Sequence, residues 1–387
     1  MPASLEVGIR IGLLVGAGSA TVGGVGPVEV TEPDGSAVVT IPAGAFWRIA
    51  ATGNGISLTS PGGWSSAPLD ALTLTPADEA SPLRVNGKPY RGVVEVLRDG
   101  AGLTVVNRLG MEAYLLGVVS AEMGRRSPAD QEALRAQAIV SRTYALRNLR
   151  RRRAQGFDLY ATVSDQAYGG VGAETPEGRD AVSATRGRVI IHNGAPIEAF
   201  YFSTCGGRTA DGYEVFRGAS RPYLRSGPDM SPHGTAYCSI SPRYRWRQEW
   251  TGPGLRTVLD RYLPQSAVRA SGSIGRVSDI RITQRSGSGR VDQLAVSLSG
   301  AEVRVDGQSN VRQVLRTPAG DLLRSTAFTL VAVGAGRDIS HLVAEGMGAG
   351  HGVGLCQWGA VGRARSGQDH QQILAAYYPG TRVERRY

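Results

Sequence analysis

The clearest hydrophobic pattern in the chain is an apolar stripe that ends in a carboxylate. Leu115, Val118 and Val119 are spaced i, i+3 and i+4, and Glu122 continues the same helical face at i+7. Gly124 is expected to end this helix, which places Glu122 in its last turn. Burial and the negative end of the helix dipole both disfavour an ionised carboxyl group. A Glu122 buried in this way would stay protonated, which is what a general acid requires.

The same pattern has a second interpretation. A glutamate at the edge of an apolar stripe can turn outward to solvent, or pair with Arg125 or Arg126 just after the helix. Periodicity alone favours this second, structural interpretation of Glu122.

A second helix is predicted over about 128–150. Ser127 is a good N-cap, and Pro128 suits the first helical position. Small residues recur along this helix and allow close approach to its neighbours, so it is expected to be central. Gln137 and Arg142 need hydrogen-bond partners if they are buried there.

Much of the remaining chain shows the alternation and turn chemistry of β structure. Asn86-Gly87 and Asp99-Gly100 flank short apolar runs, and a hairpin is expected around Asn193-Gly194. Residues 270–330 alternate as a further β-rich block. The pattern predicts an α+β fold: an antiparallel β-rich domain with a central helix pair and additional β-rich segments.

Charge and hydropathy narrow the function classes. The 387 residues carry a net charge of +10, which favours an anionic partner such as nucleic acid, a membrane surface or a bacterial wall polymer. The motifs of nucleic-acid-binding modules are absent, so nucleic acid is not expected. No apolar run reaches the length of a membrane span. Glu6 and Arg10 interrupt the apolar start, which is interpreted as a strand of a mature or trimmed chain and not as a signal peptide.

Several motifs together carry a family resemblance. They are AYLLGVVSAEM, EALRAQAIVSRTYAL, SDQAYGG, TRGRVI, AFYFSTCGGRT, PYLRS, GHGVGLCQWGA and AAYYPGTRV. With these motifs, residues 80–387 resemble the SpoIID/LytB family of sporulation protein D and amidase-enhancer proteins. The expected organisation is a β-rich segment over 1–75, a SpoIID-like catalytic core over 76–250, a β-rich block over 251–330, and a glycine-rich loop with helices over 331–387 that return to the core.

The resemblance implies a lytic transglycosylase that cleaves peptidoglycan glycan strands, preferably strands stripped of their peptides. The family's catalytic acid is the glutamate of the V-x-x-E-M motif, which is Glu122 here. Such an enzyme lies outside the cytoplasm, in the cell envelope. The alternative within the family is a non-catalytic protein that binds glycan and enhances a partner amidase.

Polar residues of the matching motifs are candidates for holding the sugars. The predicted substrate-binding residues are Arg142, Gln166, Tyr168, Ser203, Thr204, His351 and Gln357. A pair of Arg142 with Glu122 is disfavoured, because it would lower the pKa of the acid, and a role in orienting the substrate or a buried structural hydrogen bond is more consistent. Asp165, Glu198 and Asp211 are candidates for a second carboxylate, although turn or hydrogen-bond roles are favoured for them.

The three cysteines suggest a metal site. Cys205, His233, Cys238 and Cys356 would complete a Cys₃His set for a structural zinc ion. Some members of the resembled family bind zinc. The alternatives are a Cys205–Cys238 disulfide with Cys356 free, or three buried thiols.

Two other activities are disfavoured. A cysteine hydrolase would use Cys205 or Cys356 with His351, but no third orienting residue is apparent. Nucleotide binding by the glycine-rich loop fails because no G-K-[ST] follows, and the glycines do not fit a strand–GxGxxG–helix unit.

Overall fold

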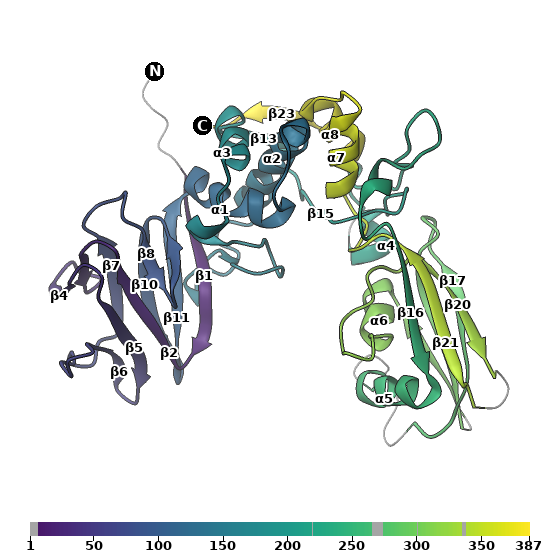
Figure 1. The fold of residues 1–387 in the computed structure, drawn as a ribbon, viewed down its shortest axis with the longest axis horizontal. Helices are drawn as coiled ribbons and strands as arrows, with labels where there is room; N and C mark the ends of the chain where they lie inside the picture. Colours follow the sequence, from purple (N-terminus) through teal and green to yellow (C-terminus); the bar gives the residue numbers. More distant parts are fainter. Residues whose placement is uncertain (1–6, 219, 265–273, 300, 335–337) are drawn as a thin grey trace. The chain divides into compact units, whose positions relative to one another are not determined.

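The computed structural model describes residues 7–218, 220–264, 274–299, 301–334 and 338–387. Antiparallel sheets and helices occur together, which confirms the predicted α+β class. The chain forms two compact units, one of residues 1–198 with 383–387 and the other of residues 199–382 (Figure 1). We call them unit 1 and unit 2.

Unit 1 contains two large sheets. The first has the order β12-β1-β11-β10-β7-β3-β4 and the second has the order β6-β5-β2-β8-β9. The strands of the first are β1 (Gly8–Ala17), β3 (Val28–Thr31), β4 (Ala37–Ile41), β7 (Ala71–Pro76), β10 (Val93–Asp99), β11 (Gly102–Gly110) and β12 (Leu159–Tyr160). Those of the second are β2 (Ser19–Gly24), β5 (Phe46–Thr52), β6 (Gly55–Thr59), β8 (Leu83–Val85) and β9 (Lys88–Tyr90).

The N-terminal strands share these sheets with later strands. β1 pairs antiparallel with β11, and β3 pairs antiparallel with β7. Ile9 and Ile11 of β1 are fully buried, which confirms the strand expected at the start of the chain. Strands on both sides of residue 75 therefore pair within the same sheets, and the boundary predicted there remains a prediction.

The helices of unit 1 follow β11 directly. They are α1 (Met111–Met123), α2 (Gln131–Arg147) and α3 (Pro176–Ala184), with the short 3-10 helices η1 (Pro128–Asp130), η2 (Arg153–Gln155) and η3 (Gly170–Ala173). Gly124 ends α1 with a φ of 68°, and Ser127 forms a capping box with Asp130. α2 packs against α1, α3 and β13 (Arg188–His192). Its central position confirms the prediction from its small residues.

A small sheet closes unit 1, in the order β14-β13-β23. β13 and β14 (Ala195–Pro196) form the hairpin expected around Asn193-Gly194, whose φ angles are 50° and 80°. The second arm is shorter than the sequence suggested, because the chain enters unit 2 at residue 199. β23 (Arg382–Arg385) brings the last residues back to unit 1.

Unit 2 is built on two antiparallel three-stranded sheets and one parallel strand pair. Their orders are β16-β21-β20, β17-β18-β19 and β15-β22. The strands are β15 (Tyr201–Phe202), β16 (Arg245–Thr251), β17 (Val277–Arg285), β18 (Val291–Leu298), β19 (Ala301–Asp306), β20 (Phe328–Val333), β21 (His341–Met347) and β22 (Leu355–Cys356). β16 and β21 pair across the boundaries predicted at residues 250 and 330.

The helices of unit 2 are short. They are α4 (Gly212–Phe216), α5 (Gly252–Tyr262), α6 (Gln308–Val314), α7 (Gln357–Arg365) and α8 (His370–Tyr377), with the 3-10 helix η4 (Tyr237–Ile240). Trp250, Leu259 and Leu294 belong to one apolar core that joins α5 and the two sheets. Among the described residues, no helix is long and apolar enough to cross a membrane.

Candidate active site and cysteine cluster

Glu122 lies at the exposed end of the buried face of α1. Leu115, Val118 and Val119 are 0% exposed, whereas Glu122 is half-buried in the last turn. Gly124 follows and ends the helix. The predicted stripe, and the place of Glu122 at its end, are confirmed.

The loop of residues 164–170 holds the Glu122 carboxyl group. The backbone N–H of Ala167 donates to Oε1 of Glu122 at 2.6 Å, and the N–H of Gly169 donates to the carbonyl of Gly117 at 3.0 Å. A Cβ atom on Gly117 would lie 2.6 Å from the ring of Tyr168. The glycine therefore allows the loop to approach α1 closely enough for its backbone to orient Glu122.

The side chains of Gln166 and Tyr168 hold this loop in place through buried hydrogen bonds. The fully buried Gln166 accepts a hydrogen bond from the hydroxyl of Tyr114 at 3.2 Å. Tyr168 is 6% exposed and donates to Oδ1 of Asn107 at 2.8 Å. Burial raises the pKa of the Tyr168 hydroxyl. Both side chains thus support the loop, and their predicted contact with sugar remains a prediction.

Arg142 pairs with Glu112 at the start of α1. Its Nε and Nη2 donate to the two carboxylate oxygens of Glu112 at 2.8 and 2.7 Å, and its side chain is fully buried. Tyr387 donates a third hydrogen bond to Glu112 at 2.7 Å. Burial opposes ionisation of Glu112, but the hydrogen bonds and charge of Arg142 outweigh it and lower the pKa of Glu112. Arg142 thus makes the buried structural hydrogen bonds that the sequence favoured over a pair with Glu122, and its predicted contact with substrate remains a prediction.

Two other acids of the motifs have structural partners. Asp165 is buried, where it pairs with Arg152 at 2.8 Å and accepts from the hydroxyl of Tyr144 at 3.0 Å. Asp211 caps α4 and pairs with Arg225 at 3.2 Å. The hydrogen-bond roles favoured for these carboxylates are confirmed.

In unit 2, His351 shapes the glycine-rich loop. Its Nε2 lies 3.0 Å from the carbonyl oxygen of Tyr201, and its Nδ1 accepts from the N–H of Val353 at 3.1 Å. This pairing requires the neutral imidazole with its proton on Nε2. Burial among aromatic rings lowers the pKa of His351 to about 4. Both ring nitrogens therefore bond to the backbone.

The other predicted sugar-binding residues of unit 2 lie around the same loop. Thr204 is fully buried and bonds to the hydroxyl of Ser241 at 2.8 Å. Ser203 is half-buried, and its carbonyl accepts from the N–H of Trp358 at 3.0 Å. Gln357 begins α7 and is 7% exposed. The substrate contacts predicted for Ser203 and Gln357 remain predictions.

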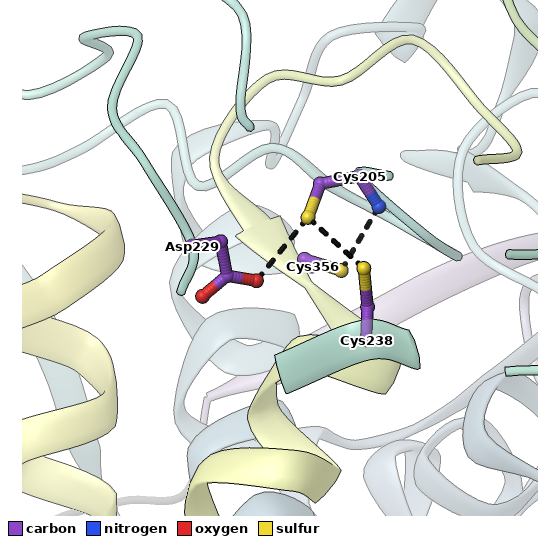
Figure 2. A group of neighbouring side chains, drawn as sticks. All are labelled: Cys205, Asp229, Cys238 and Cys356. Atoms are coloured by element: carbon purple, nitrogen blue, oxygen red, sulfur yellow. Dashed lines mark hydrogen bonds between the residues drawn. The ribbon is translucent and has the colours of Figure 1, made fainter. Parts of the chain in front are cut away.

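The three cysteines meet one carboxylate in the interior of unit 2. Figure 2 shows Cys205, Cys238, Cys356 and Asp229 turned toward a common centre, with one donor atom from each within 4.8 Å of the others. Sγ of Cys205 lies 3.3 Å from Sγ of Cys238 and 3.2 Å from Oδ2 of Asp229. None of the four is more than 2% exposed. This buried group could hold a metal ion.

Backbone N–H groups point at the sulfur atoms. The backbone N–H of Cys205 donates to Sγ of Cys356 at 3.1 Å, and the backbone N–H of Gly359 donates to the same sulfur at 3.2 Å. Burial raises the pKa of the Cys205 and Cys356 thiols. Hydrogen bonds from Cys205 and Cys356 lower the pKa of Cys238.

The prediction of His233 as the fourth member of this group is wrong. His233 is exposed in the tight turn closed by the hydrogen bond from Ser231 N to the carbonyl of Thr235 at 2.7 Å. Asp229 takes the place predicted for His233. Asp229 follows PYLRSGP, and its position in the sequence does not show that it lies next to the cysteines.

The burial of the cysteines and the hydrogen bonds of His351 bear on the cysteine-hydrolase alternative. Cys356 is fully buried, and the nitrogens of His351 already bond to Tyr201 and Val353. A nucleophilic pair needs an accessible sulfur next to a base with an available nitrogen. This arrangement disfavours that activity.

Comparisons with known proteins place the chain in a family. A family model described as stage II sporulation protein matches residues 99–192, and a domain of unknown function matches residues 235–354. An uncharacterised protein of Brachyspira hyodysenteriae is 31% identical over 301 residues, which cover 77% of this chain and 73% of that protein. The chain belongs to the stage II sporulation protein D family. The matched segment includes α1, α2 and the loop that holds Glu122.

Two relatives with descriptive names come from Bacillus subtilis. The stage II sporulation protein D is 28% identical over 295 residues, which cover 72% of this chain and 75% of that protein. The amidase enhancer is 28% identical over 349 residues, which cover 81% of this chain but 46% of the enhancer. The chain thus spans less than half the length of the enhancer.

Proposed function

We propose that this chain is a lytic transglycosylase that cleaves peptidoglycan glycan strands, with Glu122 as its general acid and base. One observation carries the proposal: a half-buried carboxyl group ends an apolar helix and is held there by the N–H of Ala167. A glutamate that only makes the surface polar would not need a backbone hydrogen bond to fix the direction of its carboxyl group. Membership of the family and the name of the amidase-enhancer relative support a role at the cell wall.

A single carboxyl group suffices for this reaction. In the first step, protonated Glu122 gives its proton to the glycosidic oxygen that leaves. In the second, the resulting carboxylate takes the proton of the substrate's own muramyl 6-hydroxyl, whose oxygen attacks the anomeric carbon. A 1,6-anhydro ring forms, the glycosidic bond is broken, and no water enters the product. Most glycosidases need a second carboxylate because water or the enzyme is the nucleophile.

The hydrogen bond from the N–H of Ala167 suits the carboxylate form of Glu122, which takes part in the second step. A backbone N–H donates to a carboxylate more strongly than to a neutral acid, so it stabilises Glu122 after the first proton transfer. It also fixes the direction of the carboxyl group toward its substrate. Placing such a donor before reaction is the usual means of stabilising developing charge.

The proposal also covers the substrate, the location and the partner of the reaction. The substrate is a glycan strand with its peptides removed, the site of action is the extracytoplasmic cell envelope, and an amidase that removes peptides is the expected partner. The cysteine cluster has a structural part in this proposal, because four protein ligands would leave a zinc ion no open position for substrate.

The second candidate is a protein that binds glycan and enhances an amidase without cleaving the strand. It is favoured by the amidase enhancer of Bacillus subtilis, to which the chain is similar over 81% of its own length. In that case, Glu122 would contribute to binding only.

A digest of purified peptidoglycan distinguishes the two candidates. Intact and amidase-treated sacculi are incubated with the wild type, with Glu122→Gln and with Glu79→Gln, a control at an exposed position of unit 1. We expect the wild type and the control to release 1,6-anhydro products and Glu122→Gln to release at least 10²-fold less, as measured by mass spectrometry. Retained binding to glycan without products from any of the three would favour the enhancer.

A further inference from the structure

We propose that Cys205, Asp229, Cys238 and Cys356 bind one zinc ion in a closed site with three sulfur ligands and one oxygen ligand. The proposal concerns unit 2 alone and does not depend on the glycan-cleaving activity. It replaces the predicted histidine ligand with a carboxylate.

The donor atoms have the chemistry and spacing that zinc requires. Zinc bonds of about 2.3 Å to sulfur and about 2.0 Å to oxygen place tetrahedral ligand atoms roughly 3.5–4 Å apart. The four donor atoms of the cluster lie within 4.8 Å of one another, so small side-chain movements complete the tetrahedron. Thiolate sulfur selects zinc over magnesium or calcium, which prefer oxygen ligands.

The carboxylate of Asp229 accepts hydrogen bonds from neighbouring side chains, as metal ligands in proteins usually do. Arg363 donates to Oδ1 of Asp229 at 3.0 Å, and the hydroxyl of Tyr377 donates to Oδ2 at 2.9 Å. Gly359 allows this packing, because a Cβ there would lie 2.2 Å from Oδ2 of Asp229. Such outer contacts fix the direction of a ligand and raise the affinity of the site.

A second, independent observation concerns Arg290. This side chain is 1% exposed and donates from Nη2 to the carbonyl of Cys205 at 3.2 Å. Its Nε and Nη1 have no hydrogen-bond partner, and it forms no ion pair within the described part of the chain. It interacts electrostatically with Cys205 and Cys356. A buried cation of this kind is costly unless negative charge lies close by.

The charges balance when the ion is divalent and the thiols are ionised. Three thiolates and the Asp229 carboxylate around a divalent ion leave two negative charges. Arg290 and Arg363, both next to the cluster, supply two positive charges. With neutral thiols, the negative charge that still acts on Arg290 would be that of Glu214.

The ion would join four segments of the chain, of which those of Cys205 and Cys356 are 151 residues apart. Cys205 follows β15, Asp229 lies in an irregular segment, Cys238 belongs to η4, and Cys356 caps α7. Apart from η4 and α7, these segments are loops or very short strands, which contribute little stability of their own. Metal binding at such a site adds directly to folding free energy. A cavity of about 950 Å³ is bordered by Cys205 and Arg290.

Metal content tests the ligand set. The full chain is purified without a polyhistidine tag, and zinc is measured by mass spectrometry for the wild type, Asp229→Ala, Cys238→Ser and His233→Ala. We expect about one equivalent of zinc in the wild type and in His233→Ala, and at least tenfold weaker zinc binding in the other two. Loss of zinc in His233→Ala with retention in Asp229→Ala would overturn the assignment.

Cobalt supplies a readout that does not depend on the variants folding. Wild-type protein exchanged with cobalt(II) is expected to show thiolate-to-cobalt charge-transfer absorption and the intense visible bands of a tetrahedral site. Absence of both, together with a Cys205–Cys238 disulfide in the intact mass, would overturn the proposal. Glycan cleavage is measured separately, so either proposal can fail while the other stands.

Discussion

At the scale of single residues, two glutamates of one helix have opposite environments. Glu112 begins α1 in a buried ion pair with Arg142, and Glu122 ends it half-buried under the loop at Ala167. The sequence identified Glu122 because its apolar stripe is local. It left the partner of Arg142 open, since helical periodicity does not fix the register between two helices. Glu112 is the partner that packing selects.

The ion pair predicts a large stability loss in Arg142→Met. The change leaves the Glu112 carboxylate buried without its cation, which costs about 3–5 kcal/mol. Denaturant unfolding measures this loss. Arg135→Met is the matched control, because its pair with Glu132 is partly exposed and we expect a loss of less than about 1 kcal/mol there. Equal losses in both variants would contradict the structural role of Arg142.

The same pair predicts a pH dependence. The pKa of Glu112 is lower in the folded chain than its ordinary value of 4.5. Its contribution to stability is therefore fully present above that value and is lost as the pH falls through the lower, folded-state pKa. Unfolding curves between pH 7 and about 3 should show a smaller acid loss in Arg142→Met than in the wild type. An unchanged acid loss would show that other groups cause it.

At the scale of elements, the sequence predicted helix ends and turns best where a cap or turn residue acts on its own backbone. Gly124, the Ser127 cap and the Asn193-Gly194 turn all ended or joined elements as expected, because each acts through its own backbone. The short helices α5 and α6 were not predicted, because they interrupt β-rich sequence. Asp229 was missed because only the fold brings it to the cysteines.

The packing of α1 on its loop predicts an effect of Gly117→Ala. The new Cβ would meet the ring of Tyr168, push the loop away and displace the N–H of Ala167 from Glu122. We expect a stability loss of about 1–3 kcal/mol and a fall in product formation per folded molecule. Gly172→Ala is the control, since nothing lies within 4 Å of its Cβ. Full activity in folded Gly117→Ala would show that the loop does not orient Glu122.

At the scale of the whole molecule, unit 2 is inserted into unit 1. The chain leaves unit 1 after residue 198 and returns at residue 383, where β23 and Tyr387 rejoin it. The predicted return of the C-terminal loop and helices to the core remains a prediction, while residues 383–387 belong to unit 1. The sequence did not reveal the insertion, because a compositional boundary does not show which strands pair. The candidate residues are divided between the units, with Glu122 in unit 1 and His351 in unit 2.

We expect Glu122 to drive an intramolecular attack of the substrate and not hydrolysis by water. Digestion of amidase-stripped glycan in ¹⁸O-labelled water, read by mass spectrometry, tests it most directly. We predict 1,6-anhydro products without ¹⁸O from the wild type, and neither cleavage nor label with Glu122→Gln. Reducing-end products that carry one ¹⁸O would contradict the account, because water would then be the nucleophile and a second carboxylate would be required.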